Sequence, residues 1–292
     1  MTEDDADDFS LRAVLEVPTS GDAERVRRHL RAVHPRATPH APGGKRTTVK
    51  RMQSRAKELT NLQERLFASA TAGGRRSMLM VLQGMDTAGK GGVTEHVMGL
   101  VNPAGLDHHA FKAPTSEELE HDFLWRVRKV LPAPGHIGIF DRSHYEDVLI
   151  ARVHNLVPKE EWSARYDVIN RFEQELVDNG TILVKCFLNV SYDEQRERLL
   201  ARLDDPTKHW KFNTGDIEER GHWADYQAAY ADVLTKCSTA AAPWYSVPAD
   251  RKWYRNWAVS RLLLETLRGI DPHYPKVELD VPALKKRLAP PN

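Results

Sequence analysis

A glycine-rich segment that follows an apolar run constrains this chain more than any other feature. The run Met78–Leu82 leads into Gly84-Met-Asp-Thr-Ala-Gly-Lys-Gly-Gly92, which matches the pattern G-x-x-x-x-G-K. Glycines let backbone N–H groups converge on phosphate oxygens, and the lysine adds a charge between phosphates. We therefore expect a phosphate-binding loop between a strand and a helix, although a plain strand-to-helix turn is the alternative. The loop residues are Gly84, Thr87, Ala88, Gly89, Lys90, Gly91 and Gly92.

The residues after Ser77 predict an α/β fold. Short apolar runs alternate with amphipathic stretches, a pattern typical of a parallel sheet with helical crossovers. Thr115 with Glu118, and Ser191 with Glu194, form capping-box patterns ahead of two helices, and the first of these carries Leu119, Phe123, Val127 and Val130 on one face. The predicted strands are Met78–Leu82, about 109–112, Ile137–Phe140, Ile182–Leu188 and Trp244–Val247.

The N-terminal part of the chain differs from the rest in composition. Eleven Lys or Arg and no Asp or Glu occur from Arg25 through Lys57. We expect residues 1–45 to form a flexible, solvated arm, or an arm that helps to hold a polyanion, ahead of a kinase domain at 46–292. Apolar Met52, Leu59, Leu62 and Leu66 predict a helix that leads into the core at about 48–68.

Composition excludes several classes of protein. The 292 residues are 41% hydrophobic, and 42 Lys+Arg nearly balance 41 Asp+Glu, so a strong field for nucleic acid is not indicated and any anion site must be local. Two cysteines support neither a disulfide framework nor a zinc cluster. The acidic N-terminus and the short apolar segment Thr181–Val190, interrupted by Lys185, favour a cytoplasmic protein without a signal peptide or membrane span.

Acidic residues near the loop indicate a metal site. Gly91 stands where a phosphate loop commonly supplies a Ser or Thr hydroxyl to Mg²⁺, so Asp86 is the substitute, or else a turn-stabilising side chain. Asp141 follows the apolar run Ile137–Phe140, where a Walker-B carboxylate lies in parallel sheets. We expect Asp86 and Asp141 to hold Mg²⁺, with Lys90 and Arg142 on the phosphoryl group.

Residues 191–223 are a candidate lid. Six basic and eight acidic residues occur there, so an ordinary solvated helical hairpin is the alternative. Nucleotide kinases place an arginine-bearing lid at this point of the chain to exclude water. Arg198 and Arg202, four positions apart, lie on one helical face. We expect Arg202 to be catalytic and Arg198, Lys208 and Lys211 to bind phosphate.

Five motifs resemble the polyphosphate kinase 2 family, whose members transfer phosphate between polyphosphate and nucleotides. The resemblance covers roughly residues 59–270. Besides the glycine-rich loop, the motifs are Phe111-Lys-Ala-Pro-Thr with Asp122-Phe-Leu-Trp-Arg126, Phe140-Asp-Arg-Ser-His-Tyr-Glu-Asp147, Asp205-Pro-Thr-Lys-His-Trp-Lys-Phe212 and Ala242-Pro-Trp-Tyr-Ser-Val-Pro-Ala-Asp-Arg-Lys-Trp-Tyr-Arg-Asn256.

The resemblance implies a thymidylate-kinase-like three-layer P-loop fold with a helical lid. It implies Mg²⁺ at Asp86 and Asp141, polyphosphate on Lys90, Arg142 and the lid arginines, and assembly into dimers or tetramers. Lys112, Arg126, Tyr145 and Glu146 lie in its motifs as candidate nucleotide-binding residues. The implied reaction is reversible, Mg²⁺-dependent transfer of a phosphoryl group from inorganic polyphosphate to AMP or ADP, or to GMP or GDP.

Two other functions stay open at the level of sequence. An ATP-dependent nucleoside or nucleotide kinase shares the loop and the lid, but Gly91 argues against it. A non-catalytic polyanion-binding protein is favoured by the basic stretch at 25–57, whereas Lys90, Asp86 and Asp141 argue against it because a pure binder has no use for carboxylates beside a polyanion.

Overall fold

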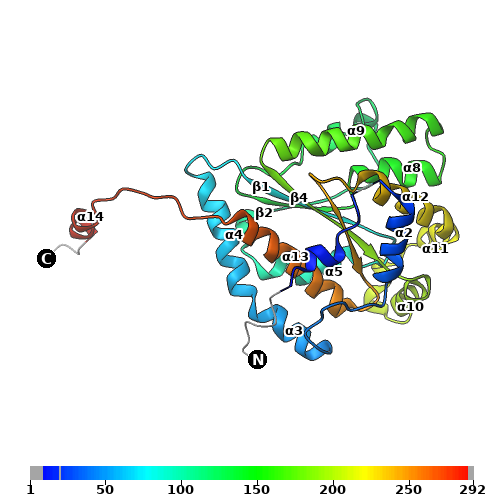
Figure 1. Cartoon of the computed structure of the whole chain (residues 1–292), viewed down its shortest axis with the longest axis horizontal. Helices are drawn as coiled ribbons and strands as arrows, with labels where there is room; N and C mark the ends of the chain where they lie inside the picture. The colour runs from blue at the N-terminus through cyan, green and yellow to red at the C-terminus, as the bar shows by residue number, and fades with distance from the viewer. Residues whose placement is uncertain (1–8, 20, 289–292) are drawn as a thin grey trace.

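A five-stranded parallel sheet forms the centre of the computed structural model, which describes residues 9–19 and 21–288 (Figure 1). The strand order is β2-β3-β1-β4-β5, so β1 pairs with both β3 and β4. Strand order therefore reverses beside β1, and ligands of open α/β sheets bind in the crevice at such a point. The strands are β1 (Ser77–Gln83), β2 (Leu106–Ala110), β3 (Ile137–Asp141), β4 (Thr181–Asn189) and β5 (Trp244–Pro248).

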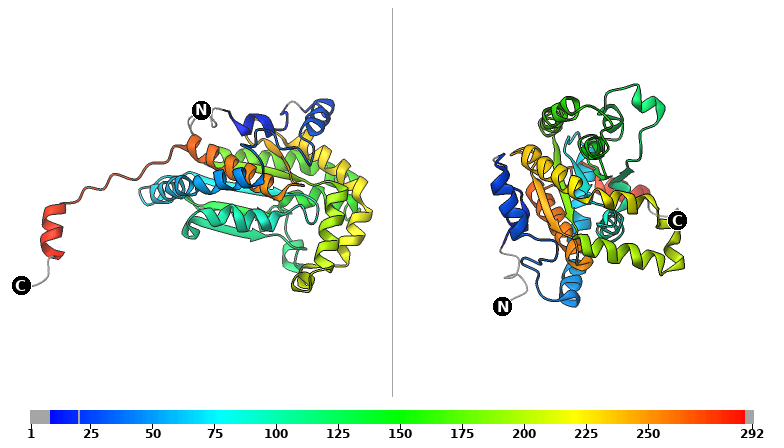
Figure 2. Two further views of the ribbon diagram at one scale, coloured as in Figure 1. Left: turned by 90° about the horizontal axis from the view of Figure 1, so that it is seen from below. Right: turned by 90° about the vertical axis from the view of Figure 1, so that its right-hand side faces the viewer.

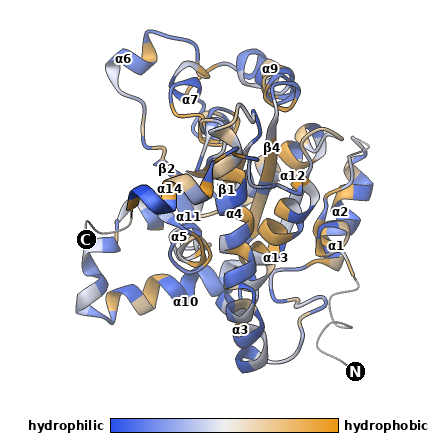
Figure 3. Ribbon diagram, turned by 90° about the vertical axis from the view of Figure 1, so that its left-hand side faces the viewer, coloured by the Kyte–Doolittle hydropathy of each residue, from blue (hydrophilic) through white to orange (hydrophobic). Residues whose placement is uncertain are grey.

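The central strands are apolar because helices cover both faces of the sheet. All seven residues of β1 are buried, and β4 is the orange strand that crosses the middle of Figure 3. The predicted α/β class is confirmed, as are the predicted strands, except that β2 ends at Ala110 and thus lies slightly earlier than expected.

The helices form two layers. One contains α8 (Ile150–Val153), α9 (Lys159–Asp178) and α12 (Trp223–Cys237), and the other α4 (Ala56–Ala70), α5 (Lys90–His96) and α13 (Lys252–Ile270) (Figure 1). Short 3₁₀ helices complete the connections: η2 (Met98–Leu100), η3 (Pro103–Gly105) and η4 (His144–Val148). Among the described residues, no helix is both long enough and apolar enough to cross a membrane.

Two predicted helices are each divided in the structure. The helix expected at about 48–68 breaks at Arg55 into α3 (Lys45–Ser54) and α4. The capping box at Thr115 is present, but its helix, α6, covers only Ser116–Leu119 and a separate helix, α7, spans Trp125–Arg128. The single helix predicted here was wrong, because the Asp122 carboxylate accepts a hydrogen bond from the Leu124 N–H and favours a local turn.

The N-terminal segment packs on the α/β domain. Helix α1 (Leu11–Leu15) buries Leu11 and Leu15 completely, and α2 (Ala23–Ala32) buries Val26. The Glu265 carboxylate on α13 accepts hydrogen bonds from the backbone N–H groups of Leu11 and Arg12. The described part of residues 1–45 is therefore not the flexible arm that we expected. The segment contains few large apolar residues, but Leu11, Leu15, Val17, Val26 and Val33 are buried in the core and Phe9, Val14 and Leu30 pack against it.

The lid segment forms a helical hairpin at the edge of the domain. It contains α10 (Tyr192–Leu203), η5 (Pro206–Lys211) and α11 (Gly215–Gly221), and Ser191 caps α10 by accepting from the Glu194 N–H. At the other end of the molecule, the Tyr274 hydroxyl contacts Glu64 of α4, and the chain beyond it leaves the body and ends in the exposed helix α14 (Val281–Leu288) (Figure 2).

Candidate active site

The glycine-rich loop joins the end of β1 to α5. A Cβ atom at Gly84, where φ is 152°, would lie 2.7 Å from the Leu188 carbonyl oxygen, so no side chain fits there. Thr87 adopts a φ of 64°, which is costly for a β-branched residue and is typical of functional sites. Within the described residues, its buried Oγ1 has no hydrogen-bond partner. The loop is thus held in a strained shape, with a polar atom left for a ligand.

Asp86 and Arg142 form an ion pair at the mouth of the loop, with 2.9 Å between Oδ1 and Nη2. Burial by itself raises the pKa of Asp86, but Lys90, Arg142 and Arg202 outweigh burial and lower it. Arg142, the residue directly after β3, adopts a φ of 65°. Although burial opposes it, Glu146 and Asp86 raise the pKa of Arg142. Asp86 therefore remains a carboxylate, and Arg142 remains charged.

A cavity of about 1370 Å³ opens from this loop along the carboxyl ends of the strands. The Lys90 Nζ lies at its base, 3.0 Å from the Gly84 carbonyl oxygen. Three carboxylates, Asp86, Glu95 and Asp141, are among its lining residues. The ten cationic residues that line it are Lys45, Lys90, Lys112, Arg142, Arg198, Arg202, Lys208, Lys211, Lys252 and Arg255. A space with this excess of positive charge favours a polyanion.

The two lid arginines have different surroundings. Arg198 is nearly buried and donates to the carbonyl oxygens of Thr87, Ala88, Ala249 and Asp250, and also to Glu194. Its donors are occupied, so Arg198 ties the loop to the segment after β5. Arg202 is more exposed and contacts the Lys211 carbonyl and Asp216 across the hairpin. Lys208 pairs with Asp205 at 2.6 Å and lies, like Lys211, along the cavity wall.

The four residues proposed to contact a nucleotide do not line one cavity. Lys112 lines the large cavity, and Arg126 lies behind it, donating to the Lys112 carbonyl. Tyr145 is fully buried, and its hydroxyl donates to Glu173 in the core, so its side chain supports the loop from behind. Only Glu146 reaches a hollow of about 220 Å³ on the other side of the Asp86–Arg142 pair.

This smaller hollow is acidic. Glu146, Asp216 and Glu219 line it together with Asp86, while Arg142 is the cation among its lining residues. Burial raises the pKa of Glu146 despite the nearby Arg142. The Asp86–Arg142 pair thus separates a basic cavity from an acidic hollow.

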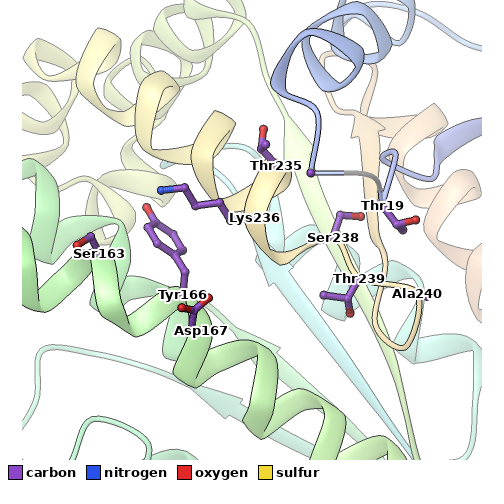
Figure 4. A pocket seen from close by; sticks show the side chains of 10 residues that line it. Thr19, Ser163, Tyr166, Asp167, Thr235, Lys236, Ser238, Thr239 and Ala240 are labelled. Carbon is purple, nitrogen blue, oxygen red and sulfur yellow. The ribbon is translucent and has the colours of Figure 1, made fainter.

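A third hollow, of about 630 Å³, lies far from the loop between α9 and α12 (Figure 4). Tyr166, Asp167 and Lys236 line it together with several hydroxyl side chains, and none of the predicted site residues does.

Sequence reasoning missed Arg255 and Lys252 on the first turn of α13. Both line the large cavity, and Arg255 donates to the Ala88 carbonyl within the phosphate loop at 3.1 Å. Both lie in the motif that ends at Asn256. Their position in the sequence could have indicated the site, because residues that follow the last strand of a parallel sheet lie at the same edge of the sheet as the phosphate loop.

A strand, a phosphate loop, a following helix and a carboxylate at the end of the neighbouring strand define a P-loop phosphotransferase of the kinase type. The sequence model of the polyphosphate kinase 2 family matches residues 44–275. This chain belongs to the polyphosphate kinase 2 family.

Two relatives and one solved structure match most of this chain. The AMP/ADP-polyphosphate phosphotransferase of Meiothermus ruber is 46% identical over 85% of this chain and 92% of its own length. The ADP-polyphosphate phosphotransferase of Rhodopseudomonas palustris is 44% identical over 81% and 84%. The crystal structure of polyphosphate kinase 2 from Arthrobacter aurescens superimposes with a TM-score of 0.88 at 46% identity and covers 96% of each chain.

Proposed function

We propose that this enzyme transfers the terminal phosphoryl group of inorganic polyphosphate to AMP or ADP, reversibly and with Mg²⁺, and that GMP and GDP are further acceptors. The observation that carries the proposal is the basic cavity, whose lining includes ten cations, among them Lys90, Lys252 and Lys45. Polyphosphate carries negative charge along its whole length and therefore favours a cavity lined by many cations. The names of the relatives from Meiothermus ruber and Rhodopseudomonas palustris support polyphosphate with AMP or ADP as the substrates.

The reaction is a displacement at phosphorus. An oxygen of the acceptor's terminal phosphate attacks the terminal phosphorus of the donor, and the bond from that phosphorus to the bridging oxygen breaks. The bridging oxygen leaves with the electron pair on the shortened polyphosphate. Lys90 and Arg142 carry the positive charge nearest to this point, where it stabilises the oxygens of the phosphoryl group in flight. Arg202 adds to it when the lid closes.

Magnesium fits the residues present. Asp86 and Asp141 both line the cavity, and Mg²⁺ in phosphoryl-transfer sites takes one or two protein carboxylates and completes its shell with phosphate oxygens and water. The described residues contain no cluster of three or more His, Cys, Asp or Glu placed to hold a metal, which agrees with an ion that depends on its substrate for ligands. When bound, Mg²⁺ would neutralise the negative charge that develops on the phosphate oxygens during transfer.

One assay tests whether polyphosphate or ATP is the phosphoryl donor. The purified protein is incubated with long-chain polyphosphate, Mg²⁺ and AMP, ADP, GMP or GDP in turn, without ATP, and the nucleotides are separated by chromatography. We expect the next higher nucleotide in each active mixture and no product after chelation of the metal. Turnover that requires ATP as the donor would instead identify an ATP-dependent nucleotide kinase, the alternative that the loop and lid also permit.

A further inference from the structure

Arg255 is a buried cation without a buried anion beside it. The residue is 3% exposed, and its guanidinium donates to the Ala88 carbonyl and to the Asn256 side-chain oxygen. Among the described residues, it forms no ion pair with a carboxylate. Burial and the neighbouring Arg198 lower the pKa of Arg255 to about 9. An uncompensated buried charge destabilises a protein, so its presence calls for an explanation.

Two other buried arginines, Arg198 and Arg261, each pair with a carboxylate. Arg198 is similarly buried but pairs with Glu194, and Arg261, further along α13, pairs with Glu265 at 3.1 Å. Arg255 instead uses three of the five N–H bonds that a guanidinium carries, with neutral acceptors for each. Two N–H bonds and the full charge remain for another partner.

The guanidinium lies directly against the phosphate loop. A Cβ atom at Gly89 would overlap Nη1 of Arg255, and one at Gly92 would lie 2.6 Å from Nη2. The guanidinium of Arg255 can therefore approach the loop this closely only because residues 89 and 92 are glycines. Because Arg255 also lines the large cavity, an anion in that cavity can reach it.

Positive charge continues from Arg255 along one wall. Lys252 precedes it by three residues on α13, and Lys45 begins α3, which packs alongside. All three line the same cavity, whose carboxylates Asp86, Asp141 and Glu95 belong instead to the loop, β3 and α5. The cavity-lining residues that α13 and α3 contribute thus include three cations and no carboxylate.

We propose that Arg255 binds a phosphate of the donor chain upstream of the transferred group, and that polyphosphate runs from the loop past Lys252 to Lys45. The inference rests on the proposed function and adds the path of the donor. This assignment puts Arg255 on the donor side of the transferred group, where the acceptor does not contact it. Binding supplies the counter-charge that Arg255 lacks in the free enzyme.

The central test compares Arg255→Gln with Arg261→Gln, the change of an equally buried but paired arginine. Binding of long-chain polyphosphate is measured by calorimetry, and stability by thermal denaturation without ligand. Because a charge-assisted contact is lost, we expect Arg255→Gln to weaken polyphosphate binding about tenfold to a hundredfold and to leave the acceptor KM within about twofold. Its melting temperature is unchanged or higher. Arg261→Gln, which removes the ion pair with Glu265, lowers the melting temperature and leaves polyphosphate affinity unchanged.

Chain length tests the path. Lys45→Ala raises the KM for long-chain polyphosphate severalfold and leaves that for tripolyphosphate unchanged, whereas Lys50→Ala, on the same helix but outside the cavity lining, changes neither. Equal effects of Lys45→Ala on both chain lengths would overturn the path.

The possible outcomes separate this inference from the function on which it rests. If the wild-type enzyme does not bind polyphosphate, the proposed function fails. If the wild-type enzyme binds it and Arg255→Gln binds equally well, the assignment of Arg255 fails. Arg255→Lys, which keeps the charge, retains more affinity than Arg255→Gln, and it supplies the measurement if the glutamine variant does not fold. If folded Arg255→Lys and the wild type bind polyphosphate with the same affinity at every ionic strength, this residue contributes to binding through its charge alone.

Discussion

Lys185 of β4 and Glu173 of α9 form an ion pair inside the protein, with 2.5 Å between Nζ and Oε2 and with both side chains fully buried. Lys185 also donates to the Tyr145 hydroxyl and the Cys237 carbonyl, and Glu173 accepts from Tyr145. Tyr145 follows Arg142 by three residues. This network therefore supports the loop that carries Arg142 from beneath.

The first prediction concerns this pair. Glu173→Gln leaves a buried, unpaired ammonium, so we expect it to lower the free energy of unfolding by about 3 to 5 kcal/mol. Adding Lys185→Met should recover part of the loss. Denaturant titration measures both. The control is Glu175→Gln on the same helix, whose exposed pair with Arg128 makes an expected difference of about 0.5 kcal/mol or less.

The stabilisation by the Lys185–Glu173 pair should depend on pH. Burial by itself raises the pKa of Glu173, but Lys185 and His144 outweigh burial and hold the pKa below its ordinary value of 4.5. A carboxyl whose pKa is lower in the folded state stabilises the protein above the unfolded pKa, and the stabilisation disappears as pH falls through the folded pKa. We expect the stability gap between wild type and Glu173→Gln to narrow below pH 4.5. A gap that is constant down to pH 3 would contradict a lowered pKa.

Loss of charge at the phosphate loop should impair chemistry and spare the fold. Asp86→Asn and Lys90→Ala each remove an interaction with the reacting phosphates, so we expect kcat to fall on the order of 10²-fold or more, with little change in melting temperature. Lys285→Ala on the exposed helix α14 serves as the control and should retain full activity. Near-normal turnover in either loop variant would be incompatible with the proposed site.

Alanine variants of the two lid arginines should have different effects, one on stability and the other on turnover. Arg198→Ala removes five hydrogen bonds that fasten the loop, so we expect a loss of stability of about 3 kcal/mol. Arg202→Ala removes two contacts within the hairpin, and we expect at least a tenfold fall in kcat with an unchanged melting temperature. If Arg202→Ala instead lowers stability and leaves kcat intact, the segment is only a solvated hairpin.

The N-terminal segment should behave as part of the core. Leu15→Ala creates a cavity where the side chain is fully buried, so we expect the free energy of unfolding to fall by about 3 kcal/mol. Leu284→Ala, at a 37% exposed leucine of α14, should have almost no effect. Equal melting temperatures of Leu15→Ala and wild type would show that the segment is loosely attached.

Features that depend on neighbours in sequence were predictable. The apolar runs that became β1, β3, β4 and β5, the glycine pattern from Gly84 to Gly92 and the capping box at Thr115 each reflect interactions over a few residues. The order of these local signals was sufficient for the α/β class and for the expectation that Asp86 and Asp141 lie at one edge of the sheet.

The tertiary structure alone decided which charges are available. Arg198 is 111 positions from Thr87, whose carbonyl oxygen it binds, and Arg255 is 167 positions from Ala88. No pattern in the chain distinguishes the arginine whose donors are all occupied from the one that retains free donors. Likewise, Tyr145 was predicted to contact a nucleotide but turns into the core, because Glu173 and Lys185 meet it there. Local sequence determines strands and loops through short-range geometry, whereas burial and pairing of side chains depend on residues that only the folded chain brings together.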